Sequence, residues 1–318
     1  MGAGGEFDRI RALLGSVPGD PRIRVGPGDD GAVIGDLVVS TDLTVEDVHF
    51  RREWLTLEEV GGRAVTVALS DLGAMGAEPI AVLLSLALPD RDRALEAAAA
   101  LGRGARAAAE RAGATLAGGD LTRSPGPLMA DVVAVGRTSD PVLRSTARAG
   151  DDLWVTGVLG GAAGAVEAWT TGSDPSPELR RRFTEPSPPL TLLRTLRARA
   201  GITAALDVSD GLLADAGHLA AASGLRARVE TRRVPVDPAL AAMGEADATR
   251  LALEGGEDYQ LLFAAPRDAR SSLEAPAVVR ITRVGELLPG RGVVRVEPDG
   301  REVDVRGGGF DHFAGSAP

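Results

Sequence analysis

The chain has 318 residues, of which 44% are hydrophobic and 25% charged, as in an ordinary globular protein. This length predicts about two domains with a sizeable core. The absence of cysteine excludes disulfides, zinc–thiolate sites, iron–sulfur clusters and thiol nucleophiles. All 35 basic residues are arginine, and the absence of lysine excludes P-loop, protein-kinase and pyridoxal chemistry.

The net charge of −10 and a pI near 5.0 argue against a nucleic-acid-binding protein. No apolar run approaches the roughly 18 residues that a membrane helix needs, and residues 1–9 lack the apolar region of a signal peptide. We therefore expect a cytoplasmic protein that binds neither nucleic acid nor membrane. An acidic protein can still bind anions when metal ions mediate the contact.

The first half of the chain predicts alternating strands and helices. Thr56 and Glu59 have capping-box spacing, so a helix is expected from there towards Leu72. A second, Ala-rich amphipathic helix is expected over residues 90–111, ending at Gly113. Short strands are expected over 37–40, which ends at an acidic turn Thr41-Asp42, and over 81–88, 115–117 and 129–135. This rhythm indicates an α+β, ferredoxin-like first domain.

Residues 138–150 are polar and contain Pro141 and Gly150, which indicates a domain junction. We therefore predict an N-terminal domain over residues 1–140 and a C-terminal domain over residues 141–318. In the second domain a helix is expected over 212–222, ended by Gly224, and a hairpin over 293–305 turning at Asp299-Gly300. Strands are expected over 153–156, 204–207, 259–264 and 278–284, and 175–189 is Pro-rich. The pattern predicts an α/β domain with a mixed sheet.

Short acidic motifs beside Gly, Ser or Thr recur at predicted strand ends and helix starts. Carboxylates in such places are held on rigid structure and point into a crevice, where they tolerate one another only with hard cations such as Mg²⁺ or Ca²⁺. Together they predict a Mg–nucleotide site, although each alone is also an ordinary turn or helix cap, Asp29 more so than Asp30. The motifs are Gly28-Asp29-Asp30-Gly31, Ser40-Thr41-Asp42, Ser70-Asp71, Gly118-Gly119-Asp120, Asp207-Val208-Ser209-Asp210-Gly211 and Gly255-Gly256-Glu257-Asp258.

Three other features of the sequence are candidate sites. The glycines over 157–164 could bind phosphate at a helix start, but a tight strand-to-helix turn is the favoured interpretation. Of the histidines His49, His218 and His312, no pair has zinc-protease spacing, and His218 falls in a predicted helix where a structural role is expected. Arg144 lies in the junction and could contact phosphate through its planar fork.

Taken in order, the motifs resemble the thiamine-monophosphate kinase family, which shares a superfamily with aminoimidazole ribonucleotide synthetase, selenophosphate synthetase and hydrogenase maturation dehydratases. The resemblance covers nearly the whole chain, and its last two blocks favour the thiamine branch. The matching blocks are Gly4-Gly5-Glu6-Phe7 with Ile10, Ser40-Thr41-Asp42 with His49-Phe50, Leu69-Ser70-Asp71-Leu72 with Met75-Gly76-Ala77, Gly118-Gly119-Asp120-Leu121-Thr122-Arg123, Ser209-Asp210-Gly211-Leu212, Gly255-Gly256-Glu257-Asp258-Tyr259 and Phe310-Asp311-His312-Phe313.

The resemblance implies a role for each matching residue. It implies Mg²⁺ ligands at Asp30, Ser40, Thr41, Asp42, Asp71, Asp120, Asp207 and Asp210. It implies ATP contacts at Gly119, Asp120, Arg144 and Ser209, and contacts to thiamine monophosphate at His49, Glu257 and Phe310. Two positions depart from the family pattern: Ala68 stands where the family has Asn, and Phe310 where other members have Tyr or Trp.

The implied reaction is ATP-dependent phosphorylation of thiamine monophosphate to thiamine diphosphate by direct in-line transfer, with two or more Mg²⁺ ions. A phosphomonoester has a second pKa of about 6, so the acceptor is already ionised at pH 7 and no general base is needed. The resemblance also implies a homodimer whose N-terminal sheets pair into a closed barrel, with ATP between the two domains. Three alternatives stay open: an aminoimidazole ribonucleotide synthetase, a metal- or nucleotide-binding protein without turnover, and an α/β protein whose acidic motifs are only turns.

Overall fold

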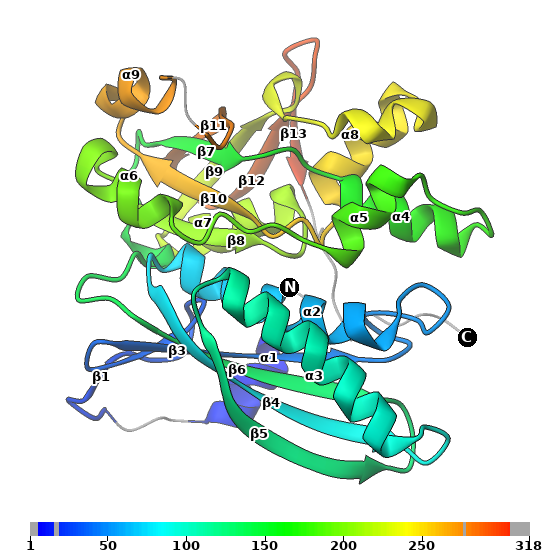
Figure 1. Ribbon diagram of the computed structural model, residues 1–318. Helices are drawn as coiled ribbons and strands as arrows, with labels where there is room; N and C mark the ends of the chain where they lie inside the picture. The colour runs from blue at the N-terminus through cyan, green and yellow to red at the C-terminus, as the bar shows by residue number, and fades with distance from the viewer. Residues whose placement is uncertain (1–5, 16–18, 276–277, 306–318) are drawn as a thin grey trace.

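The computed structural model describes residues 6–15, 19–275 and 278–305. Its first half is built on a six-stranded sheet in the order β1-β2-β3-β6-β4-β5. Helix α2 lies between this sheet and the second half of the chain, as Figure 1 shows. The elements of the first half are α1 (Glu6–Leu14), β1 (Ile23–Val25), β2 (Ala32–Ile34), β3 (Leu37–Val45), α2 (Leu57–Ala74), β4 (Glu78–Pro89), α3 (Ala94–Arg111), β5 (Thr115–Ser124) and β6 (Met129–Arg137).

The second half is built on a seven-stranded sheet in the order β13-β12-β9-β11-β7-β10-β8. The β12–β9 pair is parallel and the other pairs are antiparallel, so the expected mixed sheet is confirmed. Its strands are β7 (Asp152–Thr156), β8 (Ala204–Val208), β9 (Leu225–Glu230), β10 (Gln260–Ala265), β11 (Ile281–Pro289), β12 (Gly292–Val296) and β13 (Glu302–Val305). The helical elements are η1 (Arg144–Thr146), α4 (Gly161–Thr170), α5 (Pro177–Thr184), α6 (Leu192–Ala200), α7 (Leu212–Ala222), η2 (Thr231–Arg233), η3 (Pro238–Met243), α8 (Glu245–Glu254), η4 (Arg267–Ala269) and α9 (Arg270–Leu273).

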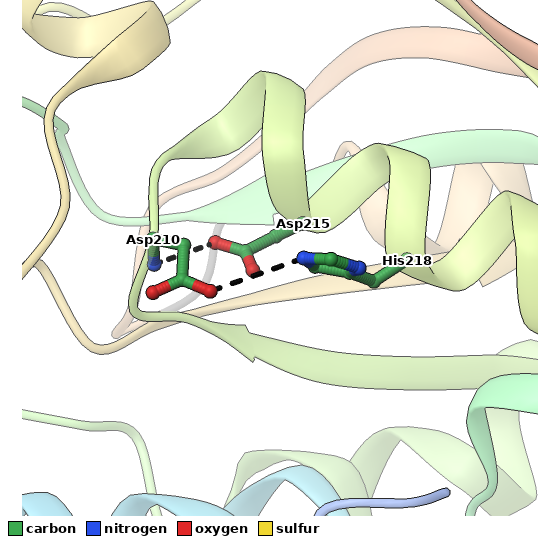
Figure 2. Close-up of side chains that lie close together, drawn as sticks. All are labelled: Asp210, Asp215 and His218. Atoms are coloured by element: carbon green, nitrogen blue, oxygen red, sulfur yellow. Dashed lines mark hydrogen bonds and ion pairs between the residues drawn. The ribbon is translucent and has the colours of Figure 1, made fainter. Parts of the chain in front are cut away.

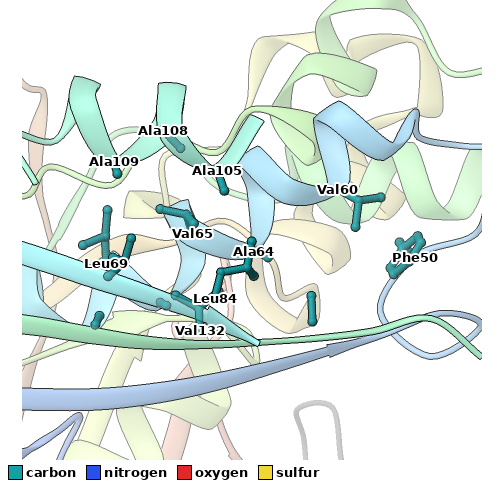
Figure 3. Packing of buried hydrophobic residues seen from close by; sticks show 14 of the residues in the cluster. Phe50, Val60, Ala64, Val65, Leu69, Leu84, Ala105, Ala108, Ala109 and Val132 are labelled. Carbon is teal, nitrogen blue, oxygen red and sulfur yellow. The ribbon is translucent and has the colours of Figure 1, made fainter. Parts of the chain in front are cut away.

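Helix α2 is the central element because it is buried by both halves. Its predicted capping box is confirmed: the Thr56 hydroxyl accepts the backbone N–H of Glu59, and the Glu59 carboxylate accepts the backbone N–H of Thr56. Helix α3 packs closely on its outer side, as Figure 3 shows. A Cβ added at Gly104 of α3 would lie 1.8 Å from the carbonyl oxygen of Glu58, so glycine permits this close contact.

The two halves share one hydrophobic core cluster. Leu69 and Val132 of the first half belong to the same cluster as Leu179, Phe183 and Leu251 of the second. Burial of the apolar side chains in this shared cluster holds the two halves against each other. A residue at the end of α2 is therefore held rigidly relative to the second sheet.

The acidic motifs Thr41-Asp42 and Gly118-Gly119-Asp120 lie inside strands, so the expectation that they form turns is wrong. Strand β3 continues to Val45, paired with β6 along its whole length. Strand β5 continues to Ser124, paired with β4. A Cβ at Gly119 would lie 1.8 Å from the Leu84 carbonyl oxygen. The glycine therefore permits the close approach of β5 to β4 and does not serve a turn.

The ferredoxin-like expectation is also wrong in its connectivity. That fold places its second helix between the third and fourth strands. Here α2 and α3 both precede β5, and only residues 125–128, which include two prolines and a glycine, connect β5 to β6. Such a link is too short for a helix, and β6 lies between β3 and β4 instead. The broader expectation of a two-domain α+β fold is confirmed.

Several boundaries differ from the sequence expectation. The second helix begins at Ala94 rather than at residue 90, and Asp90 and Asp92 before it pair with Arg123 and Arg52. The Pro-rich stretch contains α5, whose N-cap Ser176 precedes Pro177 at the first helical turn. The hairpin β12–β13 is confirmed, with Glu297 and Arg301 hydrogen-bonded across its turn. Among the described residues, no helix combines the length and apolar character needed to cross a membrane.

Candidate functional site

Three carboxylates from distant parts of the chain meet between the two sheets. Asp30 precedes β2, Asp71 lies in the last turns of α2, and Asp207 lies near the end of β8. One carboxylate oxygen from each lies within 4.8 Å of the others. Because α2 packs on β8, the fold itself brings Asp71 to Asp207. The sequence prediction that these three residues converge is confirmed by this geometry.

The cluster concentrates negative charge away from water. Burial raises the pKa of Asp207 to about 7, with the Asp30 carboxylate adding to the effect. Burial, together with Asp207 and Asp30, raises the pKa of Asp71 well above its ordinary value. Asp30 is also buried and its pKa is raised, although Arg144 of η1 pairs with its Oδ1 and opposes the shift.

The donor set fits a hard divalent cation. Three buried carboxylates repel one another unless cations neutralise them, and oxygen ligands suit Mg²⁺. The second oxygen of Asp30, Oδ2, is buried and has no hydrogen-bond partner among the described residues. A buried acceptor without a partner is costly, and a metal ion would satisfy it.

Strand β3 contributes further predicted residues to this site. Ser40 and Asp42 pair with Ala134 and Val132 of β6, so their side chains lie on the same face as the buried residues under α2. The Ser40 hydroxyl donates to the Asp71 carboxylate. Thr41 points to the opposite face, where its hydroxyl donates to Asp131 at 2.8 Å.

A cleft of about 1030 Å³ opens beside the carboxylates. Its walls come from β3 and the loop that follows it, from α2, and from the C-terminal half. It contains most of the predicted site residues: Thr41, Asp42, His49, Asp71, Arg144, Asp207, Ser209, Asp210 and Glu257. The structure therefore brings together, in one space, residues predicted to bind metal, ATP and substrate.

Two of these residues are oriented by local hydrogen bonds. The backbone N–H of Val45 donates to Nδ1 of His49 at 3.0 Å, so the neutral imidazole carries its proton on Nε2. Asp29 accepts the backbone N–H of Arg144 at 3.1 Å. Burial, together with Asp30, raises the pKa of Asp29 to about 6. Asp29 thus fixes the turn, in agreement with the prediction that it is a turn residue.

The loop between β8 and α7 is organised by Asp215, as Figure 2 shows. Oδ2 of Asp215 accepts the backbone N–H groups of Asp210 and Gly211, each at 3.1 Å. His218 lies one turn further along α7, with Nε2 3.9 Å from Oδ2 of Asp210. Burial raises the pKa of Asp215 well above its ordinary value and lowers the pKa of His218. Asp215 therefore orients the loop that carries Ser209 and Asp210.

Aromatic side chains from both halves of the chain line the cleft, among them Trp54 and Phe183. Trp54 from the first half stacks on Trp169 of α4, with ring centroids 4.9 Å apart. Phe183 of α5 meets both rings edge-on, and the Arg63 guanidinium lies 4.3 Å from the centre of its ring. Aromatic faces of this kind can accept a flat, cationic ligand.

The glycines over 157–164 form a tight turn, as expected. The Asp258 carboxylate accepts the backbone N–H of Gly160 at 2.8 Å, so an internal anion already occupies the start of α4. Burial raises the pKa of Asp258 to about 7, and this backbone hydrogen bond opposes the shift. A phosphate-binding role for this turn is therefore not supported.

Two residues predicted to contact ATP do not reach the cleft of the same chain. Gly119 and Asp120 lie on β5, the edge strand of the first sheet, and Asp120 pairs with Ser85 on the face away from α2. Phe310 lies outside the described residues. Ala68 is fully buried in the shared hydrophobic core.

Sequence reasoning gave no role to Arg63 or Asp215, and it placed Asp258 in an acidic motif without assigning it a contact. Arg63 is one of 35 arginines, and nothing in its local spacing distinguishes it. Asp215 accepts from the nearby Asp210 and Gly211, whereas Asp258 accepts from Gly160, which lies 98 residues earlier. Such hydrogen bonds from a backbone N–H to a carboxylate follow from the folded loop rather than from the residue pattern.

Comparison with known proteins agrees with this geometry. The AIR synthase related protein N-terminal domain family matches residues 28–138, and the corresponding C-terminal domain family matches residues 148–297. The curated thiamine-monophosphate kinase of Mycobacterium tuberculosis strain H37Rv is 38% identical over 308 residues, which cover 94% of this chain and 89% of that protein.

Solved structures of the same kind are also similar. A thiamine-monophosphate kinase from Stenotrophomonas maltophilia is 39% identical, with a TM-score of 0.76 over 92% of this chain and 95% of that chain. A structure described as AaThiL complexed with AMPPCP and TMP is 31% identical, with a TM-score of 0.83 over 97% of both chains. The chain therefore belongs to the thiamine-monophosphate kinase family, within the AIR synthase related proteins.

Proposed function

We propose that this protein transfers the γ-phosphoryl group of ATP to the phosphate of thiamine monophosphate, giving thiamine diphosphate and ADP. The observation that carries the proposal is the convergence of Asp30, Asp71 and Asp207 beside a cleft large enough for two small molecules. A relative of 31% identity has been solved with an ATP analogue and TMP. The same two ligand classes would occupy the cleft of this chain.

Mg²⁺ fits the cluster, with Asp30, Asp71 and Asp207 as its central ligands and Ser40, Asp42, Asp120 and Asp210 as the further proposed ones. The predicted ligand Thr41 is not retained, because its hydroxyl lies on the opposite face of β3 and donates to Asp131. When bound, Mg²⁺ neutralises phosphate charge and aligns the two reactants. Asp71 is suited to this role because the Ser40 hydroxyl fixes one of its oxygens. Arg144 pairs with Oδ1 of Asp30, whereas Oδ2 has no hydrogen-bond partner among the described residues and is available to a cation.

The proposed substrate contacts divide between ATP and thiamine monophosphate. Arg144 and Ser209 would contact ATP, together with Gly119 and Asp120. His49, Glu257 and Phe310 would contact thiamine monophosphate. The acceptor phosphate is ionised at neutral pH, so the protein needs no residue to remove a proton and its residues act by positioning. We infer direct in-line transfer without a phosphoenzyme.

We also propose a homodimer formed through the N-terminal sheet, with residues 1–140 as the metal-binding and dimerisation domain and 141–318 as the C-terminal domain. The sheet face away from α2 exposes Leu43 (51%) and Leu83 (38%), and β5 is an edge strand. Exposed apolar surface and a free strand edge favour pairing with a second copy. In such a dimer, Asp120 of one chain could join the cleft of the other.

The test is incubation of the protein with ATP, Mg²⁺ and thiamine monophosphate, with and without a chelator, followed by identification of the products. Thiamine diphosphate formed in equal amount to ADP, and only without chelator, supports the proposal. ADP release with the aminoimidazole ribonucleotide synthetase substrate instead would assign the chain to the neighbouring activity. Mg–ATP binding without product would indicate a binding protein.

A further inference from the structure

Arg63 is a buried cation that reaches from the first half of the chain to the second. It lies on α2 and is only 5% exposed. Its Nη2 pairs with Oε2 of Glu257, which belongs to the loop before β10. Its guanidinium also lies 4.3 Å from the ring centre of Phe183 and 5.5 Å from that of Tyr259. Arg63 thus contacts three residues of the second half.

Glu257 is held by a second contact on the same oxygen. The Tyr259 hydroxyl donates to Oε2 of Glu257 at 3.1 Å. Among the described residues, both contacts of the Glu257 carboxylate are therefore made through Oε2. Oε1 remains available to accept a hydrogen bond from a ligand. The side chain of Glu257 is 27% exposed and lines the cleft.

The backbone of this loop also requires external support. Glu257 has a φ of 74° and Tyr259 a φ of 49°, both in the left-handed region that residues other than glycine rarely adopt. The backbone N–H of Glu257 donates to Ser209 and that of Tyr259 donates to Val208, which ties the loop to β8. Arg63 and Tyr259 then set the direction of the carboxylate.

We propose that Arg63 is a positioning residue for substrate recognition: it fixes Oε2 of Glu257 so that Oε1 faces the cleft and accepts an N–H of a flat heteroaromatic ligand. The planar guanidinium suits this task because it pairs with a carboxylate and stacks on aromatic rings at the same time. In this proposal Arg63 acts through Glu257 and is not itself a substrate contact. Its effect should therefore fall on the acceptor substrate and not on ATP. The inference rests on the proposed function, since it assigns Glu257 to the acceptor.

The test measures binding of thiamine monophosphate by calorimetry, without ATP, and KM for each substrate. In Arg63→Met, which keeps the apolar stem, we expect affinity for thiamine monophosphate to fall about tenfold or more, with KM for ATP changed less than about twofold. Arg63→Lys keeps the charge but loses the fork, so it should recover only part of the affinity. Arg194→Met is the control because Arg194 of α6 pairs with Glu78 of β4 across the two halves, outside the cleft. This control should bind like the unaltered protein.

Tyr259→Phe keeps the inference testable if Arg63→Met does not fold, because it removes only the second contact to Oε2. A severalfold loss of thiamine monophosphate affinity is expected. If Arg63→Met folds and its affinity for thiamine monophosphate is unchanged, the inference is overturned. If Arg63→Met does not fold, unchanged affinity in Tyr259→Phe overturns it. An equal loss for both substrates, or an equal loss in Arg194→Met, would also overturn it by showing a purely structural role. Failure of the unaltered protein to bind thiamine monophosphate would instead overturn the proposed function.

Discussion

The Ser40 hydroxyl of β3 donates to the Asp71 carboxylate of α2, so a strand and a helix together hold one proposed metal ligand in place. Asp71 also lies next to Asp207 of the second sheet. This single residue therefore connects the core of the N-terminal domain with the floor of the cleft. The first prediction concerns its charge.

Asp71→Asn should lower turnover by a factor of about 100 or more while leaving the fold intact, because the amide keeps the shape but loses the anionic ligand. Asp42→Asn should act in the same direction. Steady-state rates and circular dichroism check both variants. Glu96→Gln, which alters an exposed ion pair with Arg93, should leave the rate unchanged. A near-normal rate in Asp71→Asn would refute the metal assignment.

Asp207 makes the stability of the metal-free protein depend on pH. Its pKa is about 7 in the folded protein, against 3.8 for an ordinary Asp. Between these values the unfolded chain loses its proton while the folded chain keeps it, so the contribution of Asp207 to stability is present below about pH 4 and lost as pH rises through 7. Mg²⁺ binding needs the ionised form.

Asp207→Asn should therefore raise the free energy of unfolding by about 1–3 kcal/mol at pH 8 without metal, and should have little effect near pH 4. The variant should also lose the stabilisation that Mg–ATP gives the unaltered protein. Denaturant unfolding at the two pH values, with and without Mg–ATP, provides the measurement. A variant that is equally destabilised at both pH values would show that Asp207 has an ordinary structural role.

Asp215 provides a prediction for the β8–α7 loop. Asp215→Leu leaves two backbone N–H groups of the loop without their acceptor, so the protein should lose about 1–3 kcal/mol of stability. Turnover should fall further than stability alone explains, because Ser209 and Asp210 lose their fixed position. Asp215→Asn keeps one oxygen acceptor and should retain more of both properties. Equal behaviour of the two variants would contradict this explanation.

The contact between α2 and α3 can be tested with two glycines of the same helix. Gly104→Ala places a methyl group 1.8 Å from the Glu58 carbonyl oxygen, so the helices must separate and stability should fall by about 1–3 kcal/mol or more. At Gly102 an added methyl group meets only the end of the flexible Arg106 side chain. Gly102→Ala should therefore be neutral or stabilising by up to about 1 kcal/mol. Thermal unfolding compares the two.

The proposed dimer predicts the effect of a charge on the open sheet face. Leu83→Asp places a carboxylate among exposed apolar residues of this face and should convert a dimer to a monomer. Light scattering after size-exclusion chromatography measures the mass. If Asp120 acts on the cleft of the other chain, the monomer should also lose activity. A monomeric unaltered protein would contradict the dimer.

The carboxylate cluster could be predicted because Asp30, Asp71 and Asp207 each lie in a short acidic motif and the resemblance implies a metal ligand at each of them. The backbone around other motifs was not predictable in the same way. Gly118-Gly119-Asp120 has turn composition, yet pairing with β4 makes it a strand. In this case the contacts of the sheet override local preference.

Arg63 illustrates a different limit. Its importance comes from Glu257 and Phe183, which lie far away in the sequence and approach only when the two halves share a core. No spacing rule links such residues. The α5 helix, by contrast, could have been found, since Ser176-Pro177 followed by Glu178 is a typical helix start.

The central claim is that the carboxylates of Asp30, Asp71 and Asp207 bind divalent cations beside the nucleotide. The most direct test is a crystal structure with Mn²⁺ and a non-hydrolysable ATP analogue, in which anomalous scattering locates the metal. We predict at least one Mn²⁺ ion coordinated by oxygens of these three residues and by the phosphates. Nucleotide bound with no metal at the three carboxylates would contradict the account.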